Sequence, residues 1–399
     1  MTLLRRTELA IIGAGPAGVC AALEAASHGV RVTLIDREEH IGGQLVKQTH
    51  KFFGWHEKSA GTRGIVISRD LADKVKDNPG ICFMGSTEVL GYYGDDGVLL
   101  LEAPAGIQLL EPERLLVAAG ASEKMILFPG NDLPGVYGAG AVQTLMNVRG
   151  VRPGKSVLMV GSGNIGLIVS YQLAQAGVKV AALVEALPKI GGYAVHASKI
   201  RRLGIPIYTR HTVKEAYGKN SVEGAIIWEL DDNWQGIPGT EKGLDVDVMC
   251  LATGLTPLCE FLWQAGVEMA YIPELGGFVP LYDEHMETTV KGIYVAGDAA
   301  CIEEASTAMA EGRLAGLAIA RSLGKVPDGE FSRKREDSLR ELEELRAGPT
   351  SEVIVRGLAA MRKRLEEHLS QEHSSRQAHQ PGAKPDAQQG NQQRKRVSS

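Results

Sequence analysis

One arrangement of apolar and polar positions occurs twice along the chain. Residues 9–12 (LAII) and 157–160 (VLMV) are short apolar runs, and each ends at a glycine-rich turn. After each turn, alanine or leucine recurs at helical spacing and a glycine ends that pattern. A run rich in valine and leucine then leads to an acidic residue. This periodicity predicts two strand–helix–strand units.

The turn in each unit has the spacing of a dinucleotide-binding fingerprint. The first copy reads GAGPAG (residues 13–18) and the second reads GSGNIG (residues 161–166). In such a turn the first glycine permits the bend, the second lets backbone approach a pyrophosphate, and the third lets helix and strand pack closely. The helix N-terminus presents free N–H groups to the phosphates. The positions predicted to bind nucleotide here are Gly13, Gly15, Pro16, Ala17, Gly18, Gly161, Gly163, Asn164, Ile165 and Gly166.

An acidic residue ends the second strand of each unit, Asp36 in the first copy and Glu185 in the second. A carboxylate at this position accepts hydrogen bonds from a ribose, and it repels the 2′-phosphate of NADP(H). The residues after Glu185 (ALPKIGG) contain Lys189 but no arginine. The second site is therefore expected to take NAD(H) rather than NADP(H). A single turn of this kind could be ordinary packing, but spacing, acid and repetition together favour two nucleotide sites.

Three further apolar runs end in small residues: LLVAAG (115–120), MCLATG (249–254) and GIYVAGDAA (292–300). The first two mark the places where the chain leaves and re-enters a domain. With GAGPAG, GSGNIG and GGQL (42–45), these runs resemble the two-dinucleotide-binding flavoproteins of the thioredoxin-reductase type. The resemblance extends from residue 8 to about residue 322.

The resemblance implies an α/β fold with two Rossmann-like domains, the second inserted in the first. The implied domains are a first FAD-binding segment (1–122), an NAD(H)-binding domain (123–250) and a second FAD-binding segment (251–325). The patterning of the residues that follow predicts a helical C-terminal extension (326–372) and a disordered tail (373–399). In the family, FAD occupies the first site, a nicotinamide nucleotide occupies the second, and the late aspartate binds the ribityl chain. Further cofactor-binding positions implied in this way are Arg37, Gly43, Gln44, Val89, Ala119, Gly120, Thr253, Gly254, Gly297 and Asp298.

The stretch STAMAEGRLAGLAIA (306–320) predicts a helix after Asp298, with Ser306 or Thr307 as its cap. The positive end of this helix would point toward the flavin and favour its anionic reduced form. A helix packed there only for structure would have the same geometry.

The chain lacks the paired cysteines of thioredoxin reductases. Its five cysteines include no CxxC pair, and residues 42–58 and 136–155, where the family carries such pairs, contain no cysteine. Disulfide reduction by the usual route is therefore excluded. A branch without the disulfide is more similar: the α subunits of amine and amino-acid dehydrogenases such as hydrogen cyanide synthase, opine oxidase, dye-linked proline dehydrogenase and sarcosine oxidase. Many of these carry a C-terminal cysteine cluster for iron and sulfur. This chain has no cysteine after Cys301, so either a partner supplies the cluster or none is used.

The resemblance implies an FAD-dependent oxidoreductase that exchanges hydride between NAD(H) and flavin. Its expected partner is a flavoprotein or iron–sulfur subunit. Two alternatives stay open. One is a free-standing NADH:acceptor reductase that uses quinone, ferredoxin or oxygen. The other is a non-catalytic subunit with structural FAD and ADP or ATP.

Candidate proton donors are His50 and Lys51 in KQTHKFFG (47–54), where Phe52 or Phe53 could stack on a ring. An equal alternative is a basic surface loop that packs one aromatic side chain into the core. His196 is expected on a helix surface, and Cys301 as a buried packing residue.

Composition adds exclusions. The 399 residues are 44% hydrophobic and 23% charged with a net charge of −5, which predicts a soluble globular protein and gives no basic excess for nucleic acid. Scattered cysteines fit a cytoplasmic protein without a metal site. No apolar run is long enough to span a membrane. Small molecules or other proteins are the expected partners, with an oligomer possible.

Two helical patterns follow the family-like region. FSRKREDSLRELEELRAG (331–348) alternates charges and leucines, which predicts an amphipathic helix that ends at Gly348. SEVIVRGLAAMRKRLEEHLS (351–370) predicts a second helix. Its expected packing face, against the body or a partner, comprises Val353, Leu358, Met361 and Leu365. The polar segment after residue 372 is predicted to be disordered.

Overall fold

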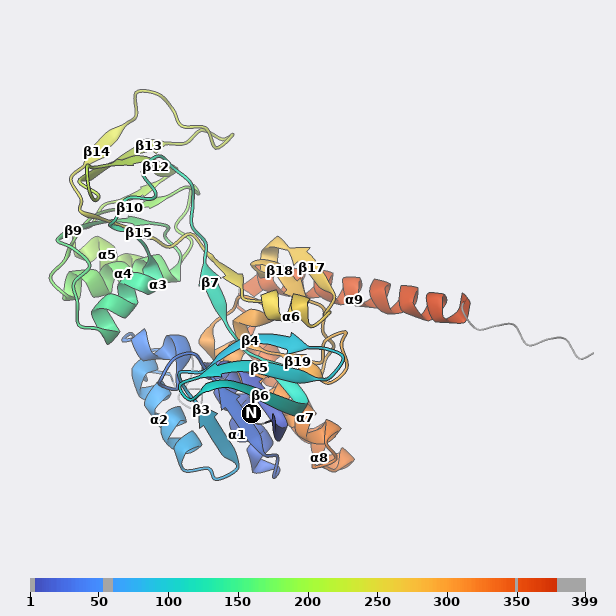
Figure 1. The fold of residues 1–399 in the computed structure, drawn as a ribbon. Coiled ribbons are helices and arrows are strands. Elements are labelled where there is room, and N and C mark those ends of the chain that lie inside the picture. The colour runs from blue at the N-terminus through green and yellow to red at the C-terminus, as the bar shows by residue number, and fades with distance from the viewer. Residues whose placement is uncertain (1–3, 53–59, 349–350, 379–399) are drawn as a thin grey trace, which may run out of the picture.

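The computed structural model describes residues 4–52, 60–348 and 351–378, with residues 372–378 described as backbone only. Two separate sheets, one mixed and one parallel, form the body of the molecule together with their helices, as seen in Figure 1.

The first sheet has seven strands in the order β3-β2-β1-β6-β5-β4, with β19 paired to β6. Strands β1, β2, β3, β6 and β19 run parallel, whereas β4 and β5 continue the sheet as antiparallel strands. Their bounds are β1 Leu4–Ile12, β2 Val32–Ile35, β3 Ile81–Met84, β4 Glu88–Tyr93, β5 Val98–Ala103, β6 Gly106–Val117 and β19 Ile293–Val295.

Helix α1 (Pro16–Ser27) packs closely on helix α7 (Ala305–Ser322), and helix α2 (Gly64–Lys76) lies beside α1. Small residues permit the close approach of α1 and α7. A Cβ atom on Gly312 would lie 2.1 Å from the carbonyl oxygen of Ala17. The predicted caps of α7 are wrong, because the helix begins at Ala305 after Glu304, and Ser306 and Thr307 lie inside its first turn.

The second sheet has five parallel strands in the order β11-β10-β9-β15-β8. They are β8 Val136–Gly138, β9 Ser156–Val160, β10 Lys179–Glu185, β11 Ile207–Thr209 and β15 Val248–Leu251. Three helices pack in the same half as this sheet: α3 (Ala139–Gln143), α4 (Asn164–Gln175) and α5 (Ala194–Arg202). A three-stranded antiparallel sheet accompanies it: β12 His211–Tyr217, β13 Gly224–Glu229 and β14 Lys242–Leu244.

A two-stranded ribbon joins the two halves. Strand β7 (Ala121–Glu123) leads out of the first half and pairs antiparallel with β16 (Leu255–Pro257), which leads back (Figure 1). The strands of the second sheet therefore fall, in sequence, between those of the first. The predicted fold class, an α/β protein with one Rossmann-like domain inserted in another, is confirmed; the domain limits given above stay predictions.

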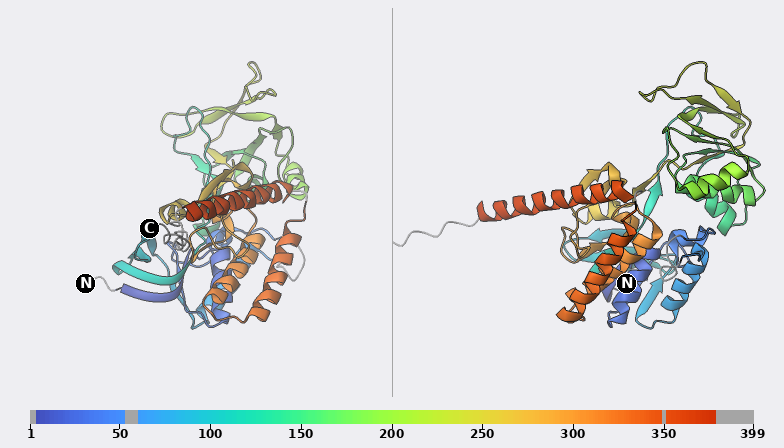
Figure 2. Two further views of the ribbon diagram at one scale, coloured as in Figure 1. Left: turned by 90° about the vertical axis from the view of Figure 1, so that its right-hand side faces the viewer. Right: turned by 180° about the vertical axis from the view of Figure 1, so that it is seen from behind.

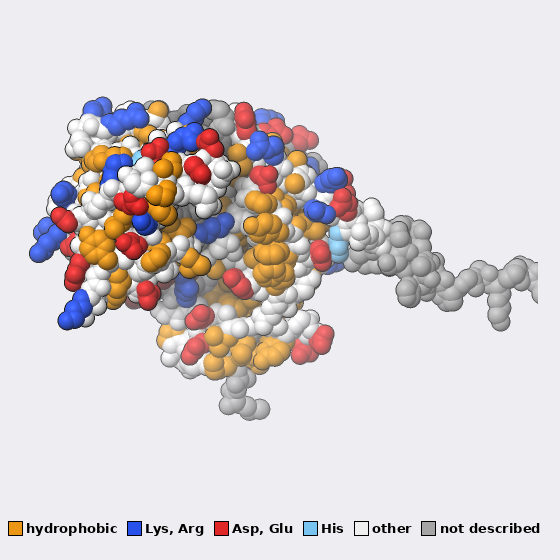
Figure 3. Space-filling view, turned by 90° about the horizontal axis from the view of Figure 1, so that it is seen from above, with side chains coloured by type: hydrophobic (Ala, Val, Ile, Leu, Met, Phe, Trp, Pro, Cys, Tyr) orange, Lys and Arg blue, Asp and Glu red, His pale blue; other side chains and the backbone are white. Residues whose placement is uncertain are grey.

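An exposed aromatic cluster lies beyond the ribbon. Helix α6 (Glu260–Gln264) and the hairpin of β17 (Met269–Ile272) and β18 (Gly277–Pro280) bring together Trp263, Tyr271 and Phe278. The ring of Phe278 lies 4.9 Å from that of Trp263 and 5.2 Å from that of Tyr271, between centroids. All three side chains are exposed. From above, hydrophobic side chains gather between the second half and the projecting C-terminal helix (Figure 3).

The C-terminal extension forms helices α8 (Asp328–Leu345) and α9 (Glu352–Ala378). Leu358 and Met361 anchor the start of α9 in the core of the first half, and the rest of the helix projects away from the body (Figure 2). The predicted position of Val353 is wrong, because its side chain is 45% exposed and Ile354 packs inward instead. The predicted disordered tail is wrong up to Ala378, where α9 ends; residues 379–399 lie outside the described residues.

Within the described ranges, no helix combines the length and the apolar character needed to cross a membrane.

Candidate functional site

The carboxyl ends of the central strands meet at one edge in each sheet. In the first sheet Ile12 is paired with both Ile35 and Val117, and Val295 is also paired with Val117. Residues that follow these strand ends are consequently brought to one edge, among them Gly13, Asp36 and Gly297. In the second sheet Val160 is paired with Val184 and Leu251, which places Gly161 and Glu185 together in the same way.

The first glycine turn (residues 13–18) has the geometry expected of a phosphate-binding loop. Gly13 has a φ of +106°, and a Cβ atom there would lie 2.2 Å from the carbonyl oxygen of Ala118. A Cβ atom on Gly18 would lie 1.9 Å from the carbonyl oxygen of Gly13. Gly15 differs, because its φ is −75° and the nearest atom to such a Cβ is the Cα of Gly43 at 4.0 Å. Packing therefore requires the outer glycines, whereas Gly15 faces open space at the start of α1.

The second glycine turn (residues 161–166) repeats this geometry. A Cβ atom on Gly161 would lie 2.3 Å from the carbonyl oxygen of Ala252, and one on Gly166 would lie 2.1 Å from that of Gly161. Around Gly163, whose φ is −63°, no atom of the described residues lies within 4 Å of such a Cβ. Both turns thus leave room for a ligand to approach the backbone at their second glycine, and both residues fit a bound pyrophosphate.

The acid at each strand end holds its own turn. The Asp36 carboxylate accepts hydrogen bonds from the backbone N–H of Ala14 at 2.6 Å and of Glu38 at 2.8 Å. The Glu185 carboxylate accepts from the N–H of Ser162 at 2.9 Å and from its hydroxyl at 2.5 Å. These carboxylates therefore shape the turns from within, and a ribose contact for either stays a prediction.

Asp298 lies in the short 3₁₀ helix η5 (Gly297–Ala299), at the same edge of the first sheet. Its hydrogen-bond partner among the described residues is the backbone N–H of Glu303, which donates to Oδ1 over a long 3.4 Å. Burial raises the pKa of Asp298 to about 6. A carboxyl group that is desolvated and so weakly hydrogen-bonded suits a hydroxyl donor such as a ribityl chain.

The remaining predicted cofactor contacts are spread over several elements. Gly43 lies against Gly15, whereas Arg37, Gln44 and Ala119 are exposed and Val89 lies in β4. Three others hold the connecting ribbon: the Thr253 hydroxyl donates to the carbonyl of Lys124 at 2.6 Å, and the carbonyls of Gly254 and Gly120 accept from the N–H groups of Lys124 and Leu258. The predicted cofactor contacts of Thr253, Gly254 and Gly120 stay predictions.

Residues 47–50 form a contact between the two halves that the sequence did not reveal. Gln172 of α4 donates to the Thr49 hydroxyl at 2.7 Å, and Asn147 donates to the carbonyl of Lys47 at 2.7 Å. Lys47 donates in turn to the carbonyl of Gly140 at 3.1 Å. Lys51, one of the candidate proton donors, is exposed and forms a β-bridge with Arg63.

His50 and His196 meet across this contact, with ring centroids 6.5 Å apart. The expected position of His196 on a helix surface is wrong, because the residue is 4% exposed. Its position four residues before the buried Ile200 in α5 is the signal that could have shown this. Burial lowers the pKa of His50 to about 4 and also lowers that of His196.

His50 stacks on Phe52, with ring centroids 5.8 Å apart, and Phe52 packs against the core as the alternative interpretation expects. Phe53 lies outside the described residues.

Tyr193 links the edges of the two candidate nucleotide sites. Its backbone N–H donates to the Asn164 side chain at 2.9 Å, beside the second glycine turn. Its hydroxyl donates to the carboxylate of Glu304 at 2.9 Å, at the start of α7. The second turn and the α7 N-terminus therefore lie on neighbouring faces of the two halves. No local pattern in the sequence marks Tyr193 for this contact.

All five cysteines are free thiols, and four of them are buried, including Cys301 as predicted. Cys301, Glu303 and Glu311 offer ligand atoms within 4.8 Å of one another. The guanidinium of Arg346 contacts both carboxylates and supplies the positive charge that a metal ion would otherwise bring to this cluster.

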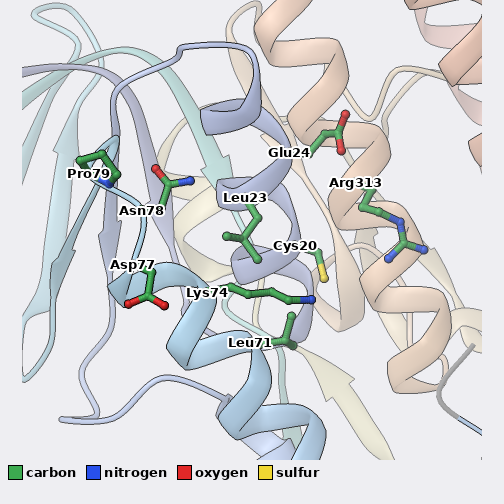
Figure 4. A pocket seen from close by; sticks show the side chains of 9 residues that line it. All are labelled: Cys20, Leu23, Glu24, Leu71, Lys74, Asp77, Asn78, Pro79 and Arg313. Atoms are coloured by element: carbon green, nitrogen blue, oxygen red, sulfur yellow. The ribbon is translucent and has the colours of Figure 1, made fainter.

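A surface groove of about 650 Å³ lies between α1, α2 and α7 (Figure 4). Lys74 extends from α2 toward α7, and Arg313 on α7 pairs with Glu341 at 2.7 Å. Glu24 and Asp77 also line the groove, so its charges balance and select neither an anion nor a cation. An adjoining cavity of about 420 Å³ shares Cys20 and Leu71 with it. Neither space is lined by a residue of the glycine turns.

Comparison with known families agrees with this geometry. The sequence pattern of the pyridine nucleotide-disulphide oxidoreductases matches residues 7–312. The chain belongs to this family. It is therefore an oxidoreductase of a flavin-dependent, pyridine-nucleotide-binding family, as the sequence predicted.

Two curated relatives are components of multi-subunit oxidases. An opine oxidase subunit from Agrobacterium tumefaciens (strain Ach5) is 27% identical over 80% of this chain and 66% of its own length. The alpha subunit of sarcosine oxidase from Rhizobium meliloti (strain 1021) is 30% identical over 79% of this chain and 31% of its own length. The chain thus spans less than two thirds of each. Thioredoxin reductase from T. acidophilum has the same fold, with a TM-score of 0.66 and 22% identity over 80% of this chain and 99% of that one.

Proposed function

We propose that this chain is an FAD-dependent subunit that exchanges hydride between NAD(H) and flavin. FAD would occupy the first glycine turn and NAD(H) the second. Electrons would pass to or from a partner flavoprotein or iron–sulfur subunit, within a cytoplasmic amine or amino-acid dehydrogenase assembly.

The observation that carries the proposal is the pair of matching turns on neighbouring faces. Gly15 and Gly163 both leave open space where a pyrophosphate would lie, and Tyr193 joins the second turn to the start of α7. Two dinucleotides bound in this way would bring their reactive ends toward the same region.

A bound flavin supplies the two-electron chemistry itself. The chain's own residues would hold and orient it. Asp298 would accept a hydrogen bond from the ribityl chain, and the N-terminus of α7 would place a partial positive charge near the ring. In the second site, the Glu185 carboxylate would disfavour a 2′-phosphate.

Two observations support electron transfer through a partner subunit. The curated relatives are named as subunits of opine and sarcosine oxidases. The cysteines of this chain are free thiols without a CxxC pair, so a thiol relay of the usual kind is not the route.

The test is a visible spectrum of the purified full-length chain, recorded without oxygen before and after NADH. A yellow protein whose flavin band bleaches with NADH is expected. The matched variants are Gly15→Ala and Gly163→Ala. Both residues have negative φ and open space, so the fold should tolerate a methyl group at either.

We expect Gly15→Ala to lose FAD affinity and Gly163→Ala to stay yellow but to bleach at least tenfold more slowly. A colourless wild-type chain that takes up no FAD would refute the proposal. A flavin band unchanged by NADH would instead support the non-catalytic subunit. Rapid turnover of the isolated chain with quinone, ferredoxin or oxygen would support the free-standing reductase.

A further inference from the structure

A buried arginine connects the C-terminal extension to the first half. Arg346 follows the last turn of α8, beyond residue 312 where the family match ends. Its guanidinium lies 2.5 Å from a carboxylate oxygen of Glu303 and 2.6 Å from one of Glu311. Its Nε lies 3.1 Å from both oxygens of Glu303, and Nε and Nη2 together give a bidentate pairing with that carboxylate.

The two carboxylates are desolvated, which makes the arginine necessary. The side chain of Glu303 is 8% exposed, that of Glu311 is 3% exposed and that of Arg346 is 14% exposed. Burial and the neighbouring charge of Glu303 raise the pKa of Glu311. Removal of the guanidinium would leave two like charges close together in a low-dielectric environment, which is strongly unfavourable.

Each glutamate also contacts the segment that carries Asp298, Glu311 through the backbone of Gly297 and Glu303 through a long contact with the Asp298 side chain. The Glu311 carboxylate accepts a buried hydrogen bond from the N–H of Gly297 at 2.9 Å. The N–H of Glu303 donates to Oδ1 of Asp298. Arg346 is therefore connected to Asp298, the residue expected to bind the ribityl chain, through Glu303 and through Glu311.

We propose that Arg346 is a positioning residue of the flavin site. It locks residues 297–304 through Glu303 and Glu311, so that docking of the C-terminal extension and binding of FAD stabilise each other. This inference rests on the proposed binding of FAD at the first glycine turn. Because binding free energies are coupled reciprocally, FAD stabilises the docked extension by the same factor by which the docked extension strengthens FAD binding.

The first test is FAD affinity, measured by titration of the full-length apoprotein and followed by the shape and position of the visible flavin band. Arg346→Gln removes the charge, and Arg346→Lys keeps it without the bidentate fork. Arg340→Gln is the matched control, because Arg340 lies on the same helix and its side chain is 66% exposed.

We expect Arg346→Gln to weaken FAD binding at least tenfold, Arg346→Lys to restore part of that loss, and Arg340→Gln to bind as the wild type does. Wild-type affinity in Arg346→Gln would overturn the inference and leave the proposed function intact. A wild-type chain that binds no FAD would overturn the proposed function and this inference with it.

A second measurement does not depend on whether the variants fold. Amide hydrogen exchange of the wild-type chain is compared with and without FAD. We expect FAD to protect residues 297–304 and also the last turn of α8, residues 342–346, which lie outside the family match. Protection of residues 297–304 without any change in residues 342–346 would overturn the coupling. Exchange in α5 serves as the internal reference.

Discussion

Asp36 and Glu185 occupy equivalent places in the two halves, and the structure gives each carboxylate the same local task. Each accepts hydrogen bonds from the backbone of its own glycine turn. A ribose contact for either carboxylate stays a prediction. At the scale of single residues, we propose that the charge of Glu185 sets the preference between NAD(H) and NADP(H).

Glu185→Gln should relax that preference. The amide keeps an acceptor for the N–H and hydroxyl of Ser162 but removes the negative charge that opposes a 2′-phosphate. A like-charge repulsion of about 1 kcal/mol at this partly exposed position corresponds to about a fivefold change. The ratio of flavin reduction rates with NADPH and NADH should rise about fivefold. The exposed Asp232→Asn is the control and should leave that ratio unchanged. An unchanged ratio in Glu185→Gln would contradict the assignment.

Asp298 should make FAD binding depend on pH. Burial raises its pKa to about 6, and a hydroxyl donor favours the charged form. Affinity for FAD should therefore rise as the pH rises from 5 to 7, while Asp298 loses its proton. Asp298→Asn should flatten this rise and weaken binding at pH 8 by about 10- to 100-fold, the equivalent of about 1.5–3 kcal/mol. The exposed Asp232→Asn serves as the control. If Asp298→Asn keeps the pH dependence of FAD affinity, that dependence belongs to another group.

At the scale of elements, α9 shows which side of an amphipathic helix the body covers. Leu358 and Met361 are 6% and 2% exposed, and Gly357 lies against Leu275, where a Cβ atom would come within 2.6 Å of its side chain. The helical period alone allowed Val353 on the same face, but the start of α9 is oriented so that Ile354 packs inward.

Met361→Ala should destabilise the extension by about 2–4 kcal/mol, because it removes a buried side chain and leaves a cavity. Val353→Ala, on the exposed side of the same helix, should change stability by less than about 0.5 kcal/mol. Urea denaturation of the two variants, with hydrogen exchange of residues 352–371, measures the difference. Equal effects of the two substitutions would show that α9 does not pack as described.

At the scale of the whole molecule, the two halves touch through a small polar contact in addition to the ribbon. Residues 47–50 and Tyr193 contribute hydrogen bonds across it. A contact formed by polar hydrogen bonds permits relative domain motion. The partly buried His50, beside the buried His196, adds a dependence on pH.

Acidification should weaken this contact. The pKa of His50 is about 4 when it is buried there, against about 6.5 in solution, so the separated or unfolded form takes up the proton first. The contact is thus most stable above pH 6.5 and loses stability as the pH falls from 6.5 toward 4. Thermal midpoints over this range should fall less steeply in His50→Gln than in the wild type, whereas the exposed His40→Gln should follow the wild type. A slope unchanged in His50→Gln would exclude this histidine as the cause.

Short contiguous patterns predicted much of the fold and of the candidate site. Each strand–turn–helix–strand unit lies within one continuous segment, and the third glycine of each turn is required by a contact close in sequence, as for Gly18 against the carbonyl of Gly13. The helices of the extension are predictable for the same reason. The errors fell where a local pattern leaves the orientation free, as at His196, Val353 and the cap of α7.

The sequence by itself determined that the chain contains two strand–turn–helix–strand units with the glycine spacing of a dinucleotide fingerprint and an acid at the end of each second strand, because the periods of helix and strand act over a few residues. Only the tertiary structure decided which distant residues meet: His50 with His196, Tyr193 with Glu304, and Arg346 with Glu303 and Glu311. These pairs are separated by long stretches of chain, and a side chain carries no local mark of a partner that packing alone brings to it. The ring contact, the hydrogen bond and the ion pairs that these residues form exist only once the two halves and the C-terminal extension have come together.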